Sequence, residues 1–442
     1  MDLLIAGGTV VACDDAGTVQ AADVLIRNGI IACIGAAARQ KVRGLVRMID
    51  ASGCVVMPGI VQAHVHLCQV LFRGMADDLP LLEWLEKRIW PLEAAHDEAS
   101  LRASADLGIL ELVSAGTTTI LDMGTVHHHD AVMHACEDSG IRAISGKAMM
   151  DAGEAVPRRL RETTKQSLAE SDRLAREWDG RADGRIRYAY APRFLLSCSE
   201  ELMRSTAARA AEQGLIVHTH VAEQLAERQA VRDAFGRDDV AVLRDWGVRG
   251  PRAVLAHGVQ LTDAEACLLA EDGTRIVHCP SANLKLGSGI ARIADLDRVG
   301  VQLALGCDGA PCNNNLDPWI EMRHAALVAK IKTGVTTMPA ERIVRLATID
   351  GARALGLDAE IGSIEVGKRG DVIVVRIDGP HAEPGGDPHS RLVYACKASD
   401  VQDVVVGGEV LVTKGAPTRM DTEAIVRRAR TEAKKLLARA DA

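Results

Sequence analysis

The chain has 442 residues, of which 48% are hydrophobic and 25% are charged, so a large core is possible and wholesale disorder is not expected. A net charge of −8 and an aromatic content of 2% argue against nucleic-acid binding. The sequence has no basic leader and no uninterrupted apolar run of spanning length, so we expect neither a secretion signal nor membrane association. Its eleven scattered cysteines predict reduced thiols and a cytoplasmic protein.

Both ends of the chain have the residue pattern of short strands. Aliphatic and β-branched runs occur before residue 57, where the Asn28-Gly29 pair is a favoured hairpin turn. Similar runs return at 371–377, 401–406 and 409–412, followed by an Ala-, Arg-, Glu- and Lys-rich segment at 421–440. We expect residues 1–56 and 366–442 to form one small β-sandwich domain, with a terminal surface helix.

The middle of the chain, residues 57–365, alternates apolar strands with amphipathic helices. The expected strands are 60–66, 118–122, 141–147, 187–192, 216–220, 253–257, 275–279 and 302–308. Eight such strand-then-helix units are typical of a (β/α)8 barrel. The predicted fold class is therefore α/β, a TIM barrel with a β-sandwich domain formed by both chain ends.

Several predicted strands end in residues that can bind a metal ion, at the end of a barrel where active sites lie. The first ends in His64-Val65-His66, and residues two apart on a strand share a face, so both imidazoles can reach one ion. Later strands end in or near His220, Glu223, His257, His278 and Asp308. A lone histidine here would be an ordinary packed residue, but the ordered series favours Zn²⁺, with Fe²⁺ or Mn²⁺ also suited to these ligands.

The motifs taken together resemble the amidohydrolase superfamily. They are Met57-Pro58-Gly59-Ile60, His64-x-His66, HTHVAE (218–223), AHG (256–258), HCPSANLKLGSG (278–289) and CDGAPCNNNLD (307–317). The similarity is closer to the branch of S-adenosylhomocysteine/methylthioadenosine deaminases, guanine and 8-oxoguanine deaminases and triazine hydrolases. It covers nearly the whole chain and implies a metal-dependent hydrolase of a small N-heterocycle that forms a homodimer or homotetramer.

The resemblance also implies roles for individual residues. One zinc ion would be held by His64, His66, His220 and Asp308, whereas His218 would point to the opposite strand face and be structural. Water activated by the metal would attack the ring, with Asp308 accepting a proton and His257 orienting the nucleophile. Glu223 would protonate the ring nitrogen and then the leaving group. His278 and Asn283 would support these residues.

The resemblance gives mixed signals about the substrate. Glu93, in the sequence Ile89-Trp90-Pro91-Leu92-Glu93, matches the ribose-binding position of nucleoside deaminases, with Trp90 near the ligand and Arg142 available for a substrate carboxylate. Gln69 and Arg193 instead match the ring contacts of guanine and 8-oxoguanine deaminases.

Three hypotheses follow. The first is zinc-dependent deamination of the 6-amino group of an adenine nucleoside, of the S-adenosylhomocysteine, methylthioadenosine or 5'-deoxyadenosine type. The alternative is deamination or dechlorination of guanine, 8-oxoguanine, a pterin or an s-triazine, for which a Glu93→Gln change should matter little. A silent binding protein is the third, and the joint presence of Glu223, His257 and Asp308 argues against it.

Overall fold

The computed structural model describes residues 2–441, and at its centre is a closed ring of parallel strands. The strands of the ring are β6 (Ile60–His66), β7 (Thr117–Met123), β8 (Arg142–Gly146), β10 (Ile186–Pro192), β11 (Ile216–Val221), β12 (Ala253–His257), β13 (Arg275–His278), β14 (Gln302–Leu305) and β15 (Asp308–Gly309). The last two divide the eighth strand position, and β15 pairs with β6 to close the ring. The short β9 (Ala148–Met149) pairs with β10. The expected barrel is confirmed.

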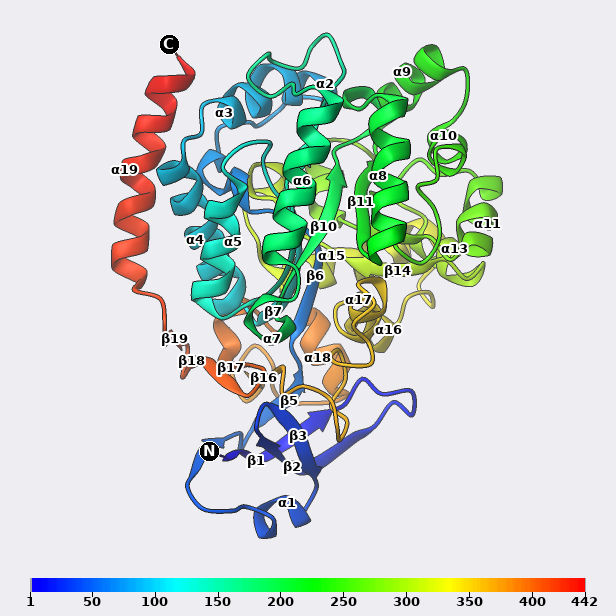
Figure 1. The fold of residues 1–442 in the computed structure, drawn as a ribbon. Helices are drawn as coiled ribbons and strands as arrows, with labels where there is room; N and C mark the ends of the chain where they lie inside the picture. The colour runs from blue at the N-terminus through cyan, green and yellow to red at the C-terminus, as the bar shows by residue number, and fades with distance from the viewer. Residues whose placement is uncertain (1, 442) are drawn as a thin grey trace.

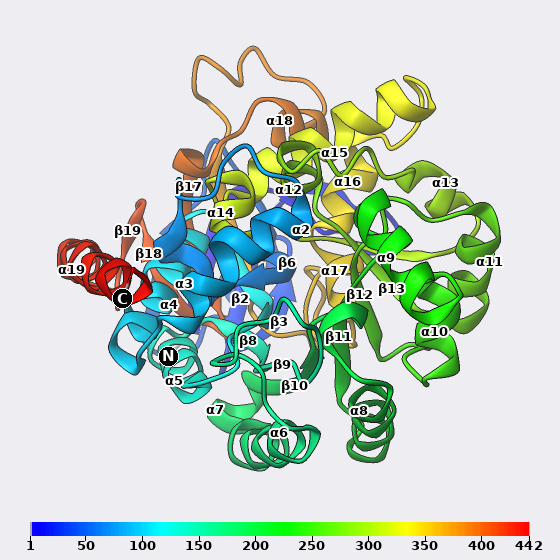
Figure 2. The ribbon, with the colours of Figure 1, turned by 90° about the horizontal axis from the view of Figure 1, so that it is seen from above.

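Every residue of β6 and of β7 is buried, as expected for parallel strands covered on both faces. Helices surround the ring (Figure 2), and several begin at Ser, Thr or Asp side chains that cap the first backbone N–H groups. These helices are α4 (Glu98–Ser114), α5 (His129–Ser139), α6 (Thr164–Trp178), α7 (Arg181–Gly184), α8 (Glu200–Gln213), α9 (Leu225–Phe235), α10 (Asp239–Asp245), α11 (Asp263–Asp272), α13 (Ile293–Arg298), α15 (Pro318–Thr333), α16 (Ala340–Leu346) and α17 (Ile349–Ala354).

A second sheet lies at one end of the barrel (Figure 1) and contains strands from both ends of the chain. Its members are β1 (Asp2–Val11), β2 (Val19–Arg27), β3 (Ile30–Ile34), β4 (Val46–Asp50), β5 (Cys54–Pro58), β16 (Val372–Arg376), β17 (Val401–Val406), β18 (Glu409–Thr413) and β19 (Ala416–Pro417). The antiparallel pairing of β5 with β16 joins the two ends, as the sequence predicted. Helices α1 (Ala37–Gln40) and α18 (Pro388–Tyr394) belong to the flanking segments.

The expected terminal helix, α19 (Thr422–Ala440), leaves the second sheet and runs along the side of the barrel against α4 (Figure 1). Arg428 contacts Asp106 of α4, and Arg439 Nε donates to Ala95 O at 2.7 Å. Within residues 2–441, no helix is both long and apolar enough to span a membrane.

Short segments cover the C-terminal end of the barrel strands, opposite the second sheet. They are η1 (Leu67–Phe72), α2 (Leu81–Trp84), η2 (Leu85–Ile89), α3 (Trp90–Ala94), η3 (Leu195–Ser197), α12 (Pro280–Lys285) and α14 (Ala310–Asn313). A further turn, η4 (Ala398–Asp400), precedes β17. The residues predicted to carry chemistry therefore lie beneath a cover made from the loops that follow the strands.

Candidate active site

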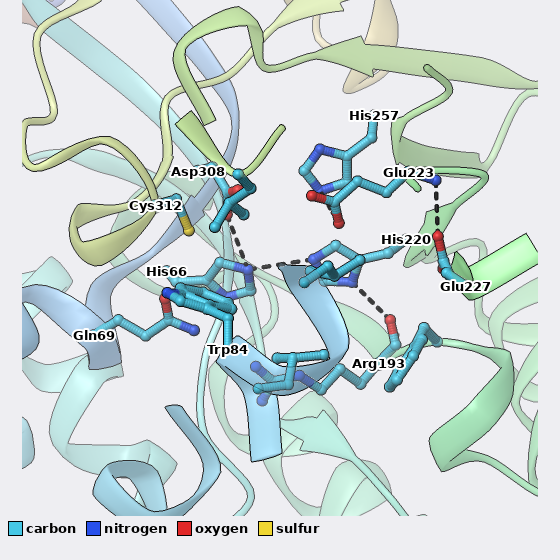
Figure 3. Close-up of a pocket in the computed structure, with 14 residues that line it drawn as sticks. His66, Gln69, Trp84, Arg193, His220, Glu223, Glu227, His257, Asp308 and Cys312 are labelled. Carbon is cyan, nitrogen blue, oxygen red and sulfur yellow. Dashed lines mark hydrogen bonds and ion pairs between the residues drawn. The ribbon is translucent and has the colours of Figure 1, made fainter. Parts of the chain in front are cut away.

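Three histidines and one aspartate converge at the C-terminal end of the barrel strands. His64 and His66 come from β6, His220 from β11 and Asp308 from β15. His66 Nε2 lies 3.3 Å from His220 Nε2 and 3.4 Å from Asp308 Oδ1 (Figure 3). Asp308 Oδ1 also lies 3.3 Å from His64 Nε2. Four ligands bound tetrahedrally to one zinc ion at about 2.0–2.1 Å would be separated by about 3.3 Å. The three distances given above have this spacing. The closely spaced ligand atoms form two groups that share His64, one with His66 and His220 and one with His257 and Asp308.

The other ring nitrogens of His66 and His220 are held by backbone carbonyls. His66 Nδ1 donates to Met123 O at 2.8 Å, and His220 Nδ1 donates to Arg193 O at 2.7 Å. A carbonyl can only accept, so each Nδ1 carries the proton and each Nε2 keeps a lone pair facing the centre. Burial lowers the pKa of His66 to about 3 and that of His220 well below its usual value. Both imidazoles are therefore neutral, the form that binds a metal.

His218 lies on the same strand face as His220, so the expectation that it points to the opposite face is wrong. Residues two apart on a strand share a side, and His218 packs directly against His64. His218 Nδ1 donates to Val254 O at 2.8 Å, which leaves its Nε2 to accept from His64 Nδ1, also at 2.8 Å. This series of hydrogen bonds leaves His64 Nε2 without a proton, and that buried atom has no hydrogen-bond partner among residues 2–441. A metal ion would satisfy it.

Glu223 and His257 lie next to the ligand set. Glu223 Oε2 is 3.4 Å from His257 Nε2, and Ser288 Oγ donates to Glu223 Oε1 at 3.3 Å. Burial raises the pKa of Glu223 to about 8, with a further contribution from the charge of Asp308. His257 Nδ1 donates to Asn283 Oδ1 at 2.9 Å, so Asn283 holds the ring of His257 from the side away from Glu223. Burial thus favours the protonated form of Glu223, which lies beside the predicted metal ligands.

The backbone is strained where two of these side chains leave their strands. His257 has a φ of 78° and Asp308 a φ of 62°, in the left-handed region that residues other than glycine seldom adopt. Such conformations persist only where the surrounding structure enforces them, and they cluster at functional sites.

Sequence reasoning missed two residues that position Glu223. Ser288 belongs to the Gly-Ser-Gly end of the 278–289 motif, and Glu227 Oε2 accepts from the Glu223 backbone N–H at 2.8 Å. The signal for Glu227 was its place three residues after Gln224, where it forms a capping box at the start of α9. By contrast, neither ring nitrogen of the buried His278 has a hydrogen-bond partner among residues 2–441, so its expected supporting bonds are not seen.

A pocket opens beside the metal ligands and contains two of the predicted ring contacts, Gln69 and Arg193 (Figure 3). Hydrophobic side chains from the covering segments line it together with Phe194, which follows Arg193; they are Leu81, Trp84, Leu85 and Leu286. The pocket is thus suited to a flat, partly apolar ring that approaches the metal site.

Glu93 does not line this pocket, because it lies behind the two ring contacts and binds both of them. Arg193 donates to Glu93 through Nη1 at 2.5 Å and through Nη2 at 3.1 Å. Gln69 Nε2 donates to Glu93 Oε1 at 2.9 Å. The carboxylate predicted to bind ribose is therefore engaged by the side chains that were predicted to bind the ring.

Two expected substrate contacts lie away from the pocket. Arg142, at the first position of β8, forms two buried hydrogen bonds with Asp371 just before β16, at the end of the barrel that faces the second sheet. Its predicted contact with a substrate carboxylate is therefore corrected to a link between the two sheets. Trp90 is buried against Phe194, and Trp84 lines the pocket instead.

Comparison with known proteins agrees with this geometry. The model of the family described as "Amidohydrolase family" matches residues 55–411. A 5'-deoxyadenosine deaminase of Methanosarcina acetivorans is 39% identical over 443 residues, covering 100% of both chains. A 5-methylthioadenosine/S-adenosylhomocysteine deaminase of Moorella thermoacetica is 39% identical over 86% of each chain. The crystal structure of an adenosine deaminase from Xanthomonas campestris with bound zinc superposes with a TM-score of 0.92 at 33% identity, covering 99% of each chain.

Proposed function

This chain belongs to the amidohydrolase family, and we propose that it is a metal-dependent deaminase that releases ammonia from the 6-amino group of an adenine nucleoside with a modified 5' end. The observation that carries the proposal is the complete set of ligand atoms beside Glu223 and His257. The names of the full-length relatives support the nucleoside as substrate.

The side chains of the site divide the reaction between them. A bound divalent ion would supply Lewis-acid activation of the attacking water. His257 orients the nucleophile through Nε2, because its Nδ1 proton is committed to Asn283. Asp308 accepts a proton from the water, and Glu223 donates its own to the ring nitrogen next to the attacked carbon. Glu223 then takes the proton of the hydroxyl group on the tetrahedral carbon and delivers it to the leaving amine. Ammonia departs as the carbonyl group forms and the ring regains its aromaticity, and the proton held by Asp308 returns to Glu223.

A second function has an observation of its own in its favour. Gln69 and Arg193 line the pocket whereas Glu93 does not, so the contacts available in this conformation read a ring rather than a ribose. The position of Gln69 and Arg193 in the pocket favours deamination or dechlorination of another heterocycle, such as guanine, 8-oxoguanine, a pterin or an s-triazine.

Ammonia release from the zinc-loaded protein separates the two functions. The panel consists of 5'-deoxyadenosine, methylthioadenosine, S-adenosylhomocysteine, adenosine, guanine, 8-oxoguanine, a pterin and a chlorotriazine. Turnover confined to the nucleosides supports the first function, and turnover confined to the free heterocycles replaces it with the second. A Glu223→Gln variant of matched metal content is the control for chemistry at this site.

We further propose that the resident metal is zinc, that the protein forms a homodimer or homotetramer, and that it works in the cytoplasm. The histidine and aspartate ligand set supports zinc over harder ions. All eleven cysteines are free thiols, and ten of them are buried, which supports a reducing compartment. Metal analysis by mass spectrometry and light scattering of the purified protein test the first two statements.

A further inference from the structure

Gln69, Glu93 and Arg193 form one buried network at the edge of the pocket. The Glu93 carboxylate accepts three hydrogen bonds, two from the Arg193 guanidinium and one from the Gln69 amide. The side chains of Glu93 and Arg193 are 1% and 4% exposed, so water does not compete for these bonds. Burial alone lowers the pKa of Arg193, but the Glu93 charge outweighs that effect and raises it. The Arg193 guanidinium therefore stays charged where it meets the Glu93 carboxylate.

The carboxylate also decides which way the Gln69 amide faces. A carboxylate only accepts hydrogen bonds, so Gln69 must turn its NH2 group towards Glu93. Its carbonyl oxygen Oε1 then lies on the other side, next to Gly309, where it is buried and has no hydrogen-bond partner among residues 2–441. A buried acceptor without a partner costs free energy until a ligand or water supplies a donor. Without Glu93 the amide could rotate and offer a donor instead.

We infer that Glu93 is a positioning residue, which fixes Gln69 as an acceptor and Arg193 as a donor towards the substrate ring and does not itself bind ribose. Gln69 and Arg193 touch the pocket, and Glu93 reaches it only through them. The pair is complementary to a heterocycle that carries an N–H donor near an acceptor nitrogen or carbonyl. The inference rests on the proposed function only in taking an N-heterocycle as substrate.

Glu93→Gln is the informative change because it keeps the size of the side chain. An amide in place of the carboxylate points its NH2 group at an Arg193 donor in either orientation, and in one orientation at the Gln69 NH2 group as well, so the network loses at least one hydrogen bond. The experiment measures Kd by calorimetry for hypoxanthine and for 5'-deoxyinosine, which share a base and differ by the sugar. We expect both affinities to fall by a similar factor, about tenfold to a hundredfold. The Glu93→Asp variant keeps the charge, so its affinity for both ligands should lie between that of the Glu93→Gln variant and that of the parent protein.

A loss of affinity confined to 5'-deoxyinosine would overturn the inference and assign Glu93 to the ribose. Unchanged affinity for both ligands would also overturn the inference. A second comparison tests action through the two partners: in a Gln69→Leu, Arg193→Met background, adding Glu93→Gln should change either Kd less than twofold. Glu86→Gln, an exposed change in the same covering segment, is the matched control.

Failure of the proposed function would be recognised separately. If the parent protein bound neither ligand but turned over guanine, the nucleoside proposal would fall, and the Glu93→Gln comparison would be made on the KM and kcat for guanine. Positioning then predicts a similar loss with this free base, whereas a ribose-binding Glu93 predicts none.

Discussion

Replacing Arg142 by Met should destabilise the protein without impairing its active site. The Arg142 guanidinium donates to Asp371 through Nε at 2.9 Å and Nη2 at 3.0 Å, and the two side chains are 5% and 1% exposed. Removing the cation leaves a buried carboxylate whose one remaining partner within residues 2–441 is the Gly407 N–H, at 2.7 Å. Breaking a buried ion pair from one side costs about 3–5 kcal/mol of unfolding free energy.

Urea unfolding followed by circular dichroism, together with kcat/KM at a temperature where the variant is folded, checks this prediction. The midpoint should fall while kcat/KM stays within about twofold, since Arg142 lies at the opposite end of the barrel from the pocket. An Arg142→Met, Asp371→Leu double variant should recover most of the loss, because no unpaired charge remains. Full stability with lost turnover would refute the reasoning and would support the predicted contact between Arg142 and a substrate carboxylate.

Four further outcomes are expected. Glu223→Gln should lower kcat by about 10²–10⁴-fold at unchanged metal content. In the parent protein, kcat/KM should fall as pH rises through about 8, where Glu223 loses its proton. A flat pH profile of kcat/KM from pH 6 to 9.5 would contradict the role of Glu223 as the acid. Burial raises the pKa of Glu321 to about 8 from 4.5, so its contribution to stability is present below pH 4.5 and is lost as pH rises towards 8; Glu321→Gln should therefore be more stable than the parent at pH 8 but not at pH 5 in thermal melts. Gly309→Ala would place a methyl group 2.1 Å from Gln69 Oε1, and we expect weaker substrate binding with little loss of secondary structure, measured as KM and by circular dichroism. Chelation should abolish ammonia release and lower Tm, and zinc should restore both, whereas an unchanged Tm would argue against a metal held by His64, His66, His220 and Asp308.

Much of the barrel could be predicted from local pattern alone. Apolar runs bounded by turn residues identify each strand, and strand ends in a (β/α)8 barrel converge at one face, so His64, His66, His220 and Asp308 could be brought together without coordinates. Two-residue periodicity also fixes the common face of His218 and His220, although the expectation for His218 did not apply it.

The network around Glu93 could not be predicted in the same way. Its members come from η1, α3 and the end of β10, and no spacing rule relates the geometry of a covering segment to a strand end. Likewise the buried pair of Arg142 and Asp371 joins residues 229 positions apart. The sequence by itself determined the fold class and the ligand types, because these follow from residue chemistry and strand periodicity, whereas the role of Glu223 as the acid is implied by the family resemblance. Only the tertiary structure decided which charges pair, because a buried charge takes the partner that packing brings within reach.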